Sequence, residues 1–420
     1  MTARQASAAV GWFLLASPVL AFPAMLGPGH QWIAAGVAVV TMLGAVGFVM
    51  HHGPLPRFVL LLVGTSIVGW MAAHDQPETI NHFCGLALGL FTMATIAVWC
   101  RTRERLTLVT LGFLLCGAVA LSVGSRSVTR VHTSKALFKE TTAVMSTATP
   151  LPLAALHSRT SVNPNALAAT AMMILTVAMA VALSPLRWPG LQTAIRFSGL
   201  LTAVWAVVVV AVMQSRSAWL SALVVLWVWA RAAVRPRLWW LITGLMMIAL
   251  PLTLFVVLPE HPRVIDLMQA VKERIGIWTQ GLEALRPSPW FGIGFDYYRH
   301  SGYSPILVFP STIVGQPHAH NIFLQTALDV GVIGLVAYLG IMGYVALRAI
   351  QAVKSKPGDP WVRHIAAGAA LSLLSVHVYG LLDAVPLGAK VGIFQWASCG
   401  LILASWRVLG APGSSGMSRD

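Results

Sequence analysis

Charged residues are scarce in this chain, and acidic residues are the scarcest. Only 10% of its 420 residues are charged, whereas about a quarter are charged in soluble domains. With 57% hydrophobic residues, the composition excludes an ordinary soluble protein and indicates a polytopic membrane protein. The 28 Lys and Arg outnumber the 13 Asp and Glu, a surplus that could indicate nucleic-acid binding. Most of these cations lie in short connections between apolar runs, which is the positive-inside pattern, so we expect membrane lipids as partners and no nucleic acid.

Cysteine pairs and clustered acidic motifs are also missing. The four cysteines lie inside or at the ends of apolar runs, with no Cys-x-x-Cys pair among them; they are Cys84, Cys100, Cys116 and Cys399. We therefore expect thiols that pack within the membrane domain, with no disulfide and no cysteine-based metal site. No Asp-x-Asp motif stands in the connections between apolar runs. We expect neither a metal ion nor another cofactor.

The apolar residues gather into twelve runs of roughly 17 to 21 residues, the length that crosses roughly 30 Å of hydrocarbon. The runs begin near Ala8, Trp32, Phe58, Phe83, Leu106, Ala166, Phe197, Ala218, Leu238, Asn321, Ile365 and Val391. The predicted fold class is an all-α integral membrane protein of about twelve transmembrane helices in a single polytopic domain. The first run could be a signal peptide, but Pro18, Pro23 and the span directly after it favour a retained helix.

The charges in the connections predict an orientation. Connections assigned to the inner side carry most of the Arg and Lys, so both termini are predicted to be cytoplasmic. Three outer connections carry cations against this rule: the basic loop 124–165, which includes Arg159; the turn at Arg216; and the large loop 259–319. Outer cations near a membrane surface indicate an anionic ligand, for which a diphosphate is the commonest membrane-attached candidate. For the loop 124–165, a merely solvated basic loop is the alternative.

Two of these arginines are candidates for phosphate binding. Arg216 stands in a turn of about four residues between two apolar runs, where a guanidinium could bind phosphate oxygens or snorkel to lipid headgroups. Arg274 and Trp278 are four residues apart in a helical pattern over residues 264–285, so they share one face of an amphipathic helix. An intrahelical partner such as Glu273 is the alternative for Arg274. The Gly292-Ile293-Gly294 sequence lacks the third glycine of a dinucleotide loop and predicts a tight turn.

Histidines mark the point where the large loop re-enters the membrane. His318 and His320 precede Asn321, which could cap the next helix. An imidazole suits proton transfer near neutral pH, although an interfacial histidine without chemistry is the common case. A His-x-His pair could bind metal, but no carboxylate cluster accompanies it in the outer loops. Asp383, at the outer end of the eleventh run, could orient an imidazole or pair with Lys390.

Taken in order, these motifs resemble the O-antigen ligase and polymerase superfamily. The matching motifs are Gln214-Ser215-Arg216-Ser217, Arg274 with Trp278, Pro289-Trp290-Phe291-Gly292-Ile293-Gly294, and His320-Asn321-Ile322-Phe323-Leu324-Gln325 followed by Gly331 to Gly334. The resemblance covers roughly residues 163–383. It implies a multi-helix glycosyltransferase of the GT-C type with a large periplasmic loop, and a glycan donor on undecaprenyl diphosphate.

The resemblance also implies roles for individual residues. Arg216 and Arg274 look like the diphosphate binders and His320 like the catalytic base. His318, Asn321, Arg159 and Asp383 are further candidates for the substrate site. A diphosphate is already a good leaving group, so the expected chemistry is a metal-free, inverting transfer in which arginines stabilise the departing phosphate.

The specific prediction is an O-antigen ligase of the bacterial inner membrane with its active site facing the periplasm. It would move O-antigen from undecaprenyl diphosphate to lipid A core oligosaccharide. A polymerase or a protein O-oligosaccharyltransferase is the alternative within the same chemistry. A lipid-linked glycan flippase is the alternative from another class, but it should carry intramembrane charges along a path through both leaflets, whereas most charges here stand at the ends of apolar runs.

Overall fold

A computed structural model describes residues 3–23, 31–50, 52–73, 79–127, 163–185, 190–233, 235–252, 262–299, 318–355 and 358–410. All regular secondary structure within these ranges is helical, as predicted. The helices are α1 (Ala3–Ala21), α2 (Gln31–Phe48), α3 (Leu55–Ala72), α4 (Thr79–Trp99), α5 (Arg103–Ser127), α7 (Pro164–Leu183), α8 (Gln192–Met213), α9 (Arg216–Ala233), α10 (Pro236–Leu252), α11 (Pro262–Leu285), η4 (Tyr297–Arg299), α12 (Ile322–Lys354), α13 (Pro360–Tyr379), η5 (Lys390–Gly392) and α14 (Ile393–Gly410).

Nine helices of the described ranges are long and apolar enough to cross a membrane: α2, α3, α4, α5, α7, α8, α12, α13 and α14. The chain is therefore a multi-pass integral membrane protein, as its composition predicts. The remaining three predicted runs also form helices, namely α1, α9 and α10. The apolar part of α1 is shorter (Val10–Ala21), and α10 has only 17 residues.

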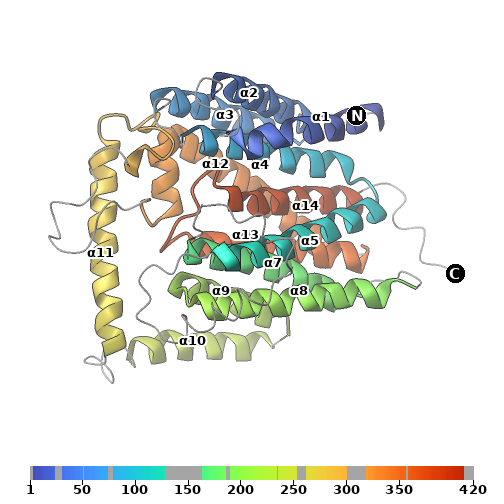
Figure 1. Ribbon diagram of the computed structural model, residues 1–420. Helices are drawn as coiled ribbons and strands as arrows, with labels where there is room; N and C mark the ends of the chain where they lie inside the picture. Colours follow the sequence, from blue (N-terminus) through green and yellow to red (C-terminus); the bar gives the residue numbers. More distant parts are fainter. Residues whose placement is uncertain are drawn as a thin grey trace.

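The spans lie side by side, and α11 runs across their ends (Figure 1). The helices at the centre of the bundle approach each other closely because small residues stand at their contacts. At Gly368 of α13, an added Cβ would lie 2.5 Å from Ala180 Cβ and 3.0 Å from the Thr176 carbonyl oxygen of α7. No larger side chain fits at this crossing without moving the helices apart.

Helix α12 is broken near its start, and the loop before it repairs the break. Gly331 has φ 75° and ψ 176°, which separates residues 322–330 from the long remainder of the helix. The backbone groups released by the break bond to the loop: Ile293 N–H donates to Leu328 O at 2.7 Å, and Val332 N–H donates to Pro289 O at 2.9 Å. A broken helix is tolerated in a membrane protein when its backbone groups are satisfied in this way.

The tight turn predicted at Gly292-Ile293-Gly294 is confirmed and belongs to this repair. Gly292 and Gly294 have φ values of 76° and 109°, which residues with a side chain rarely adopt. An added Cβ at Gly292 would lie 2.5 Å from Leu328 O, and at Gly294 it would lie 2.6 Å from Ala73 Cβ. The two glycines therefore let the loop backbone approach both α12 and the end of α3.

Two boundaries can be compared with the predicted loops. The loop expected from residue 124 begins later, because α5 continues to Ser127. The helix expected over residues 264–285 is confirmed as α11. Arg159 lies outside the described residues, so its predicted role remains a prediction.

Candidate active site

Loops and helix ends that are far apart in sequence meet at one end of the bundle. Thr79, the first residue of α4, donates to Phe295 O at 2.9 Å. The first amide of α12, at Ile322, donates to Gly380 O at 2.7 Å at the end of α13. This end of the bundle therefore joins the loop after α11, the start of α12 and the loop after α13.

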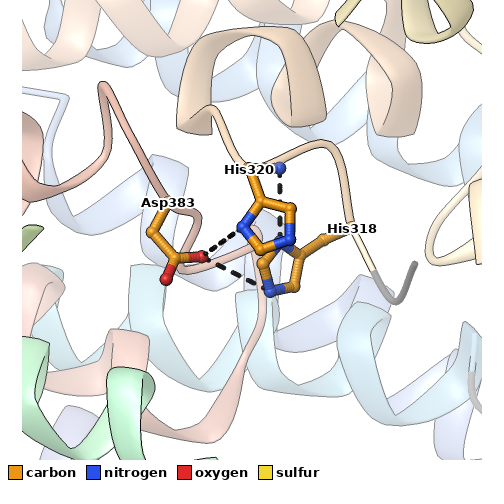
Figure 2. A group of neighbouring side chains, drawn as sticks. All are labelled: His318, His320 and Asp383. Carbon is orange, nitrogen blue, oxygen red and sulfur yellow. Dashed lines mark hydrogen bonds and ion pairs between the residues drawn. The ribbon is translucent and has the colours of Figure 1, made fainter. Parts of the chain in front are cut away.

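His318, His320 and Asp383 form a compact cluster here (Figure 2). Asp383 Oδ1 lies 3.1 Å from His320 Nδ1 and 3.6 Å from His318 Nε2. The Asp383 side chain is only 2% exposed, and those of His318 and His320 are 10% and 20% exposed. Of the two partners predicted for Asp383, the structure shows the contact with an imidazole, whereas the Lys390 ammonium lies over the ring of Phe22, 5.3 Å from its centroid.

The buried carboxylate of Asp383 is held in its charged form. Besides the histidines, Ala384 N–H donates to Oδ1 at 2.9 Å and the Tyr379 hydroxyl donates to Oδ2 at 2.9 Å. Burial by itself would raise the pKa of Asp383. The hydrogen bond from His320, the electrostatic attraction of both imidazoles and the Ala384 amide oppose burial and leave the pKa below its usual range.

The hydrogen bonds also assign the proton positions on the two rings. His320 N–H donates to His318 Nδ1 at 3.3 Å, so the neutral His318 ring carries its proton on Nε2, facing Asp383. His320 presents Nδ1 to Asp383, and the bond to a carboxylate requires a proton there. This tautomer leaves the ring lone pair of His320 on Nε2, which is the arrangement of a general base oriented by a carboxylate.

The backbone around His320 is fixed from both sides. His320 has φ 48°, an unusual value for a residue with a side chain. The Asn321 side chain accepts from Phe323 N–H and Leu324 N–H at 3.0 Å each and thus caps α12, as predicted. Its amide group also donates to Leu381 O at 3.3 Å, which ties the cap to the loop that carries Asp383.

Sequence reasoning missed a buried polar chain behind the histidines. Gln325 Oε1 accepts from Ala319 N–H at 2.8 Å, and Gln325 Nε2 donates to Asp329 Oδ1 at 2.8 Å. Asp296 N–H lies 3.4 Å from the same Asp329 oxygen. Gln325 and Asp329 are 1% and 0% exposed. The signal that could have found them is a Gln and an Asp four residues apart at the start of an otherwise apolar run.

Arg274 reaches the cluster from α11. Its Nε donates to Leu382 O at 2.7 Å and its Nη1 donates to Ala270 O at 3.1 Å. Both acceptors are backbone carbonyl oxygens, so these contacts differ from the predicted alternative, an acidic partner on α11. They use two of the five N–H groups of a guanidinium, so Arg274 can still donate to an anion beside Asp383.

Arg216 stands at the first position of α9, after a two-residue turn that ends α8 at Met213. Ser221 of α9 donates to Ser375 O of α13 at 2.8 Å. Arg216 is five residues, roughly 7 Å, before Ser221 along the helix, and Ser375 is close to the C-terminal end of α13. Arg216 therefore lies at the same end of the bundle as Asp383, and its side chain is exposed there.

A cavity of about 180 Å³ opens next to the cluster. Its polar lining comes from α4, the start of α7, the loop before α12 and the loop after α13, and consists of His82, Asn163, Asp296, His318, Tyr379 and Asp383. Several hydrogen-bonding groups of a substrate could be received in such a space.

The cluster also has the composition of a metal site. One ligand atom from each of His318, His320 and Asp383 lies within 4.8 Å of the others. The sequence argument concerned a carboxylate cluster; in the structure the end of α13 and the loop after it bring a single carboxylate, Asp383, to the two histidines. The distances and tautomers are equally those of one imidazole N–H donating to the carboxylate, at His320, and a second ring N–H facing it at 3.6 Å, at His318, and we interpret the cluster in that way.

Comparisons with known proteins agree with the sequence motifs. Residues 201–339 match a sequence model of the O-antigen ligase family. A segment of 91 residues is 28% identical to the exopolysaccharide production protein ExoQ of Rhizobium meliloti (strain 1021), and this alignment covers 21% of each protein. The family match spans α8 to the first half of α12, which includes Arg216, Arg274, His318 and His320.

Proposed function

We propose that this chain is a member of the O-antigen ligase superfamily, which its family match and the ExoQ similarity support, and that it transfers a glycan from a lipid diphosphate to an acceptor hydroxyl. The observation that carries the proposal is the His320–Asp383 pair, with an arginine bonded to the same loop. A base and a phosphate-binding group side by side are the two requirements of this transfer.

His320 is the proposed base. Asp383 fixes the ring through Nδ1 and stabilises the imidazolium that forms when Nε2 takes the acceptor proton. The acceptor oxygen then attacks the anomeric carbon, the bond from that carbon to the diphosphate oxygen breaks, and the diphosphate leaves with its electron pair. One displacement inverts the anomeric configuration, and a positioned base of this kind contributes about 10² to 10⁴-fold to a rate.

Arg216 and Arg274 are the proposed partners of the departing diphosphate. Hydrogen bonds to a charged group contribute roughly 1.5 to 3 kcal/mol each, and donors placed where charge develops favour the transition state. Arg274 is held in place by two carbonyl oxygens before any ligand binds. His318 and Asn321 support the loop and the cap, while Arg159 would add a further cation from the loop before α7. Since arginines can hold the leaving group, the proposed reaction needs no metal.

The resemblance to the family supports a proposal for the specific substrates. We propose undecaprenyl diphosphate-linked O-antigen as donor and lipid A core oligosaccharide as acceptor, in an enzyme of the GT-C type. We also propose that α1, α9 and α10 cross the bacterial inner membrane with the nine other spans. This gives twelve crossings, cytoplasmic termini and a periplasmic site, and it agrees with the charge pattern of the connections.

The ExoQ similarity favours one alternative acceptor. ExoQ is named for exopolysaccharide production, so a growing polysaccharide on a second lipid diphosphate is the second candidate. A flippase would use the same arginines for binding only and would not need the oriented base.

The deciding experiment supplies purified protein in lipid nanodiscs with lipid-linked O-antigen and with either lipid A core or more donor. The ligase proposal predicts that the core oligosaccharide becomes extended, with one glycan per acceptor. Extension of the donor itself would establish a polymerase. Absence of any new glycosidic bond from protein that binds the donor would contradict the transferase proposal.

A further inference from the structure

Helix α11 carries an apolar stripe that packing within the described bundle does not cover. Met268, Val271, Ile275 and Leu282 are 41%, 40%, 52% and 59% exposed. Their spacing of three, four and seven residues places them on one face of the helix. Trp278 stands on the same line and is partly exposed. Large apolar side chains are therefore exposed along most of the described length of α11.

The stripe is separate from the face that packs on the bundle. Ile277, Gly281 and Ala284 are buried, and a Cβ added at Gly281 would lie 2.9 Å from the Leu324 side chain of α12. The third face is polar, with exposed Gln269, Lys272, Thr279 and Glu283. At 100° per residue the centres of the three faces are roughly 120° apart.

One exposed face of α11 is apolar and the other is polar, and this arrangement indicates what surrounds the helix. A helix in water would gain nothing from gathering its exposed apolar residues on one side and its charges on the other. A helix at the boundary between hydrocarbon and water places one face in each, which is the property of interfacial helices. The sorting of side chains on α11 therefore indicates that lipid covers the stripe.

The course of the helix agrees with this position. In Figure 1, α11 runs across the ends of the spans and thus along the membrane surface. It follows α10, whose exposed Leu238, Leu241, Leu245 and Ile248 form an apolar surface of the same kind. Exposed apolar side chains therefore occur on both α10 and α11, as expected of helices in contact with lipid.

We propose that α11 lies in the membrane interface, with the stripe against lipid acyl chains and the Lys272 and Glu283 face in water. Arg274 stands between the stripe and the packed face and is fixed by Leu382 O. In this position, α11 holds the Arg274 guanidinium at the depth of lipid phosphates. The inference does not depend on glycosyl transfer and can be tested on inactive protein.

The test uses single cysteines labelled with an environment-sensitive fluorophore. Cys116 is exposed and is replaced by serine, while Cys84, Cys100 and Cys399 are buried. Val271→Cys and Leu282→Cys report on the stripe, and Gln269→Cys and Glu283→Cys are matched controls on the polar face. The protein is placed in vesicles of phosphatidylethanolamine and phosphatidylglycerol, with nitroxide-labelled lipids or aqueous iodide as quencher.

The stripe positions should be quenched several-fold more by nitroxide lipid than by iodide, and the control positions should show the reverse. Equal iodide quenching at Val271→Cys and Gln269→Cys would show that the stripe is in water and would overturn the proposal. Protection of the stripe positions from both quenchers would show that protein, such as a second copy of the chain, covers the stripe, which would also overturn it. Both results can be distinguished from failure of the proposed reaction, since no substrate is present.

Discussion

Asp383 is a charged residue that the surrounding structure stabilises in an apolar setting. Its three hydrogen-bond donors and the nearby His318 ring come from two loops and a helix end, so the carboxylate is satisfied only when the His318–His320 segment and the end of α13 are both in place. Removing one partner of a buried charge is costly because the other remains without compensation. The geometry of the base and the local fold thus depend on each other.

The pH dependence of the rate separates the carboxylate from the imidazole. The pKa of Asp383 is below its usual range, so its interactions are fully present above about pH 3.9, the ordinary aspartate value, and are lost only as the pH falls through the lower folded value. Histidine protonation changes between pH 5 and 8. Acidification across that range should lower the transfer rate without lowering the Tm, as measured in parallel on the wild type. A matching fall in Tm would contradict this assignment.

Gln325 should act as a positioning residue. Gln325→Leu removes the acceptor of the buried Ala319 N–H, which costs roughly 1 to 3 kcal/mol, and it removes one of the two donors to Asp329 Oδ1. We expect a lower Tm and a kcat reduced by at least about tenfold, with an unchanged KM for the donor, because only the histidine segment moves.

Thr326→Val is the control, since the buried Thr326 hydroxyl bonds only within α12, to Ile322 O. Its kcat should stay near the wild-type value. A Gln325→Leu enzyme with normal kcat at a temperature where it is folded would show that the polar chain has no part in positioning the base.

At the scale of elements, the break in α12 organises the site. Gly331 has φ 75°, and a Cβ added at this position would collide with the backbone of Trp290 and Phe291. We expect Gly331→Ala to destabilise the protein by more than the roughly 1 to 3 kcal/mol of such backbone strain. The variant should also reduce transfer, because the segments that meet at the break support the histidine segment.

Gly343→Ala is the matched control on the same helix, because nothing lies within 4 Å of its added Cβ. Thermal unfolding and transfer rate should be measured for both variants. A Gly331→Ala protein as stable and active as Gly343→Ala would mean that the break is not required.

The helices were predictable from the sequence to different degrees. Apolar runs of sufficient length identified the spans, and the Asn321 cap followed from its place before an apolar run. The break at Gly331 was not predictable, because the apolar pattern continues through it and the repair comes from backbone groups of the loop at residues 289–294. The local pattern of apolar residues predicts which side chains face lipid, but it does not predict where a helix changes direction.

At the scale of the whole molecule, the site is an assembly of distant segments. His320 and Asp383 are 63 residues apart in sequence, and Arg274 bonds to a carbonyl 108 residues away. The sequence motifs identified Arg216, Arg274 and His320 separately as candidate site residues. Only the packing of α11, α12 and α13 brings Arg274 and His320 to the same loop, and no spacing rule in a single sequence encodes that contact.

The same assembly leads to a prediction about metals. If His320 donates an N–H to Asp383 and His318 directs its own N–H toward the same oxygen, the cluster needs no ion, and EDTA should leave the transfer rate within about twofold of its initial value. The measurement is turnover of dialysed protein with EDTA, then with added Zn²⁺ or Mg²⁺. Loss of activity with EDTA and its restoration by one ion would make His318, His320 and Asp383 metal ligands and would contradict the assigned tautomers.

The central claim is that His320 takes the acceptor proton. Donor affinity and transfer rate should therefore be measured side by side for His320→Ala and His318→Ala in lipid nanodiscs, with donor binding as the control for folding. We predict that His320→Ala binds the lipid-linked glycan almost as the wild type does, while its rate falls by roughly 10² to 10⁴-fold, and that His318→Ala is milder. An equal loss of binding and rate in His320→Ala, or an active His320→Ala beside an inactive His318→Ala, would contradict the account.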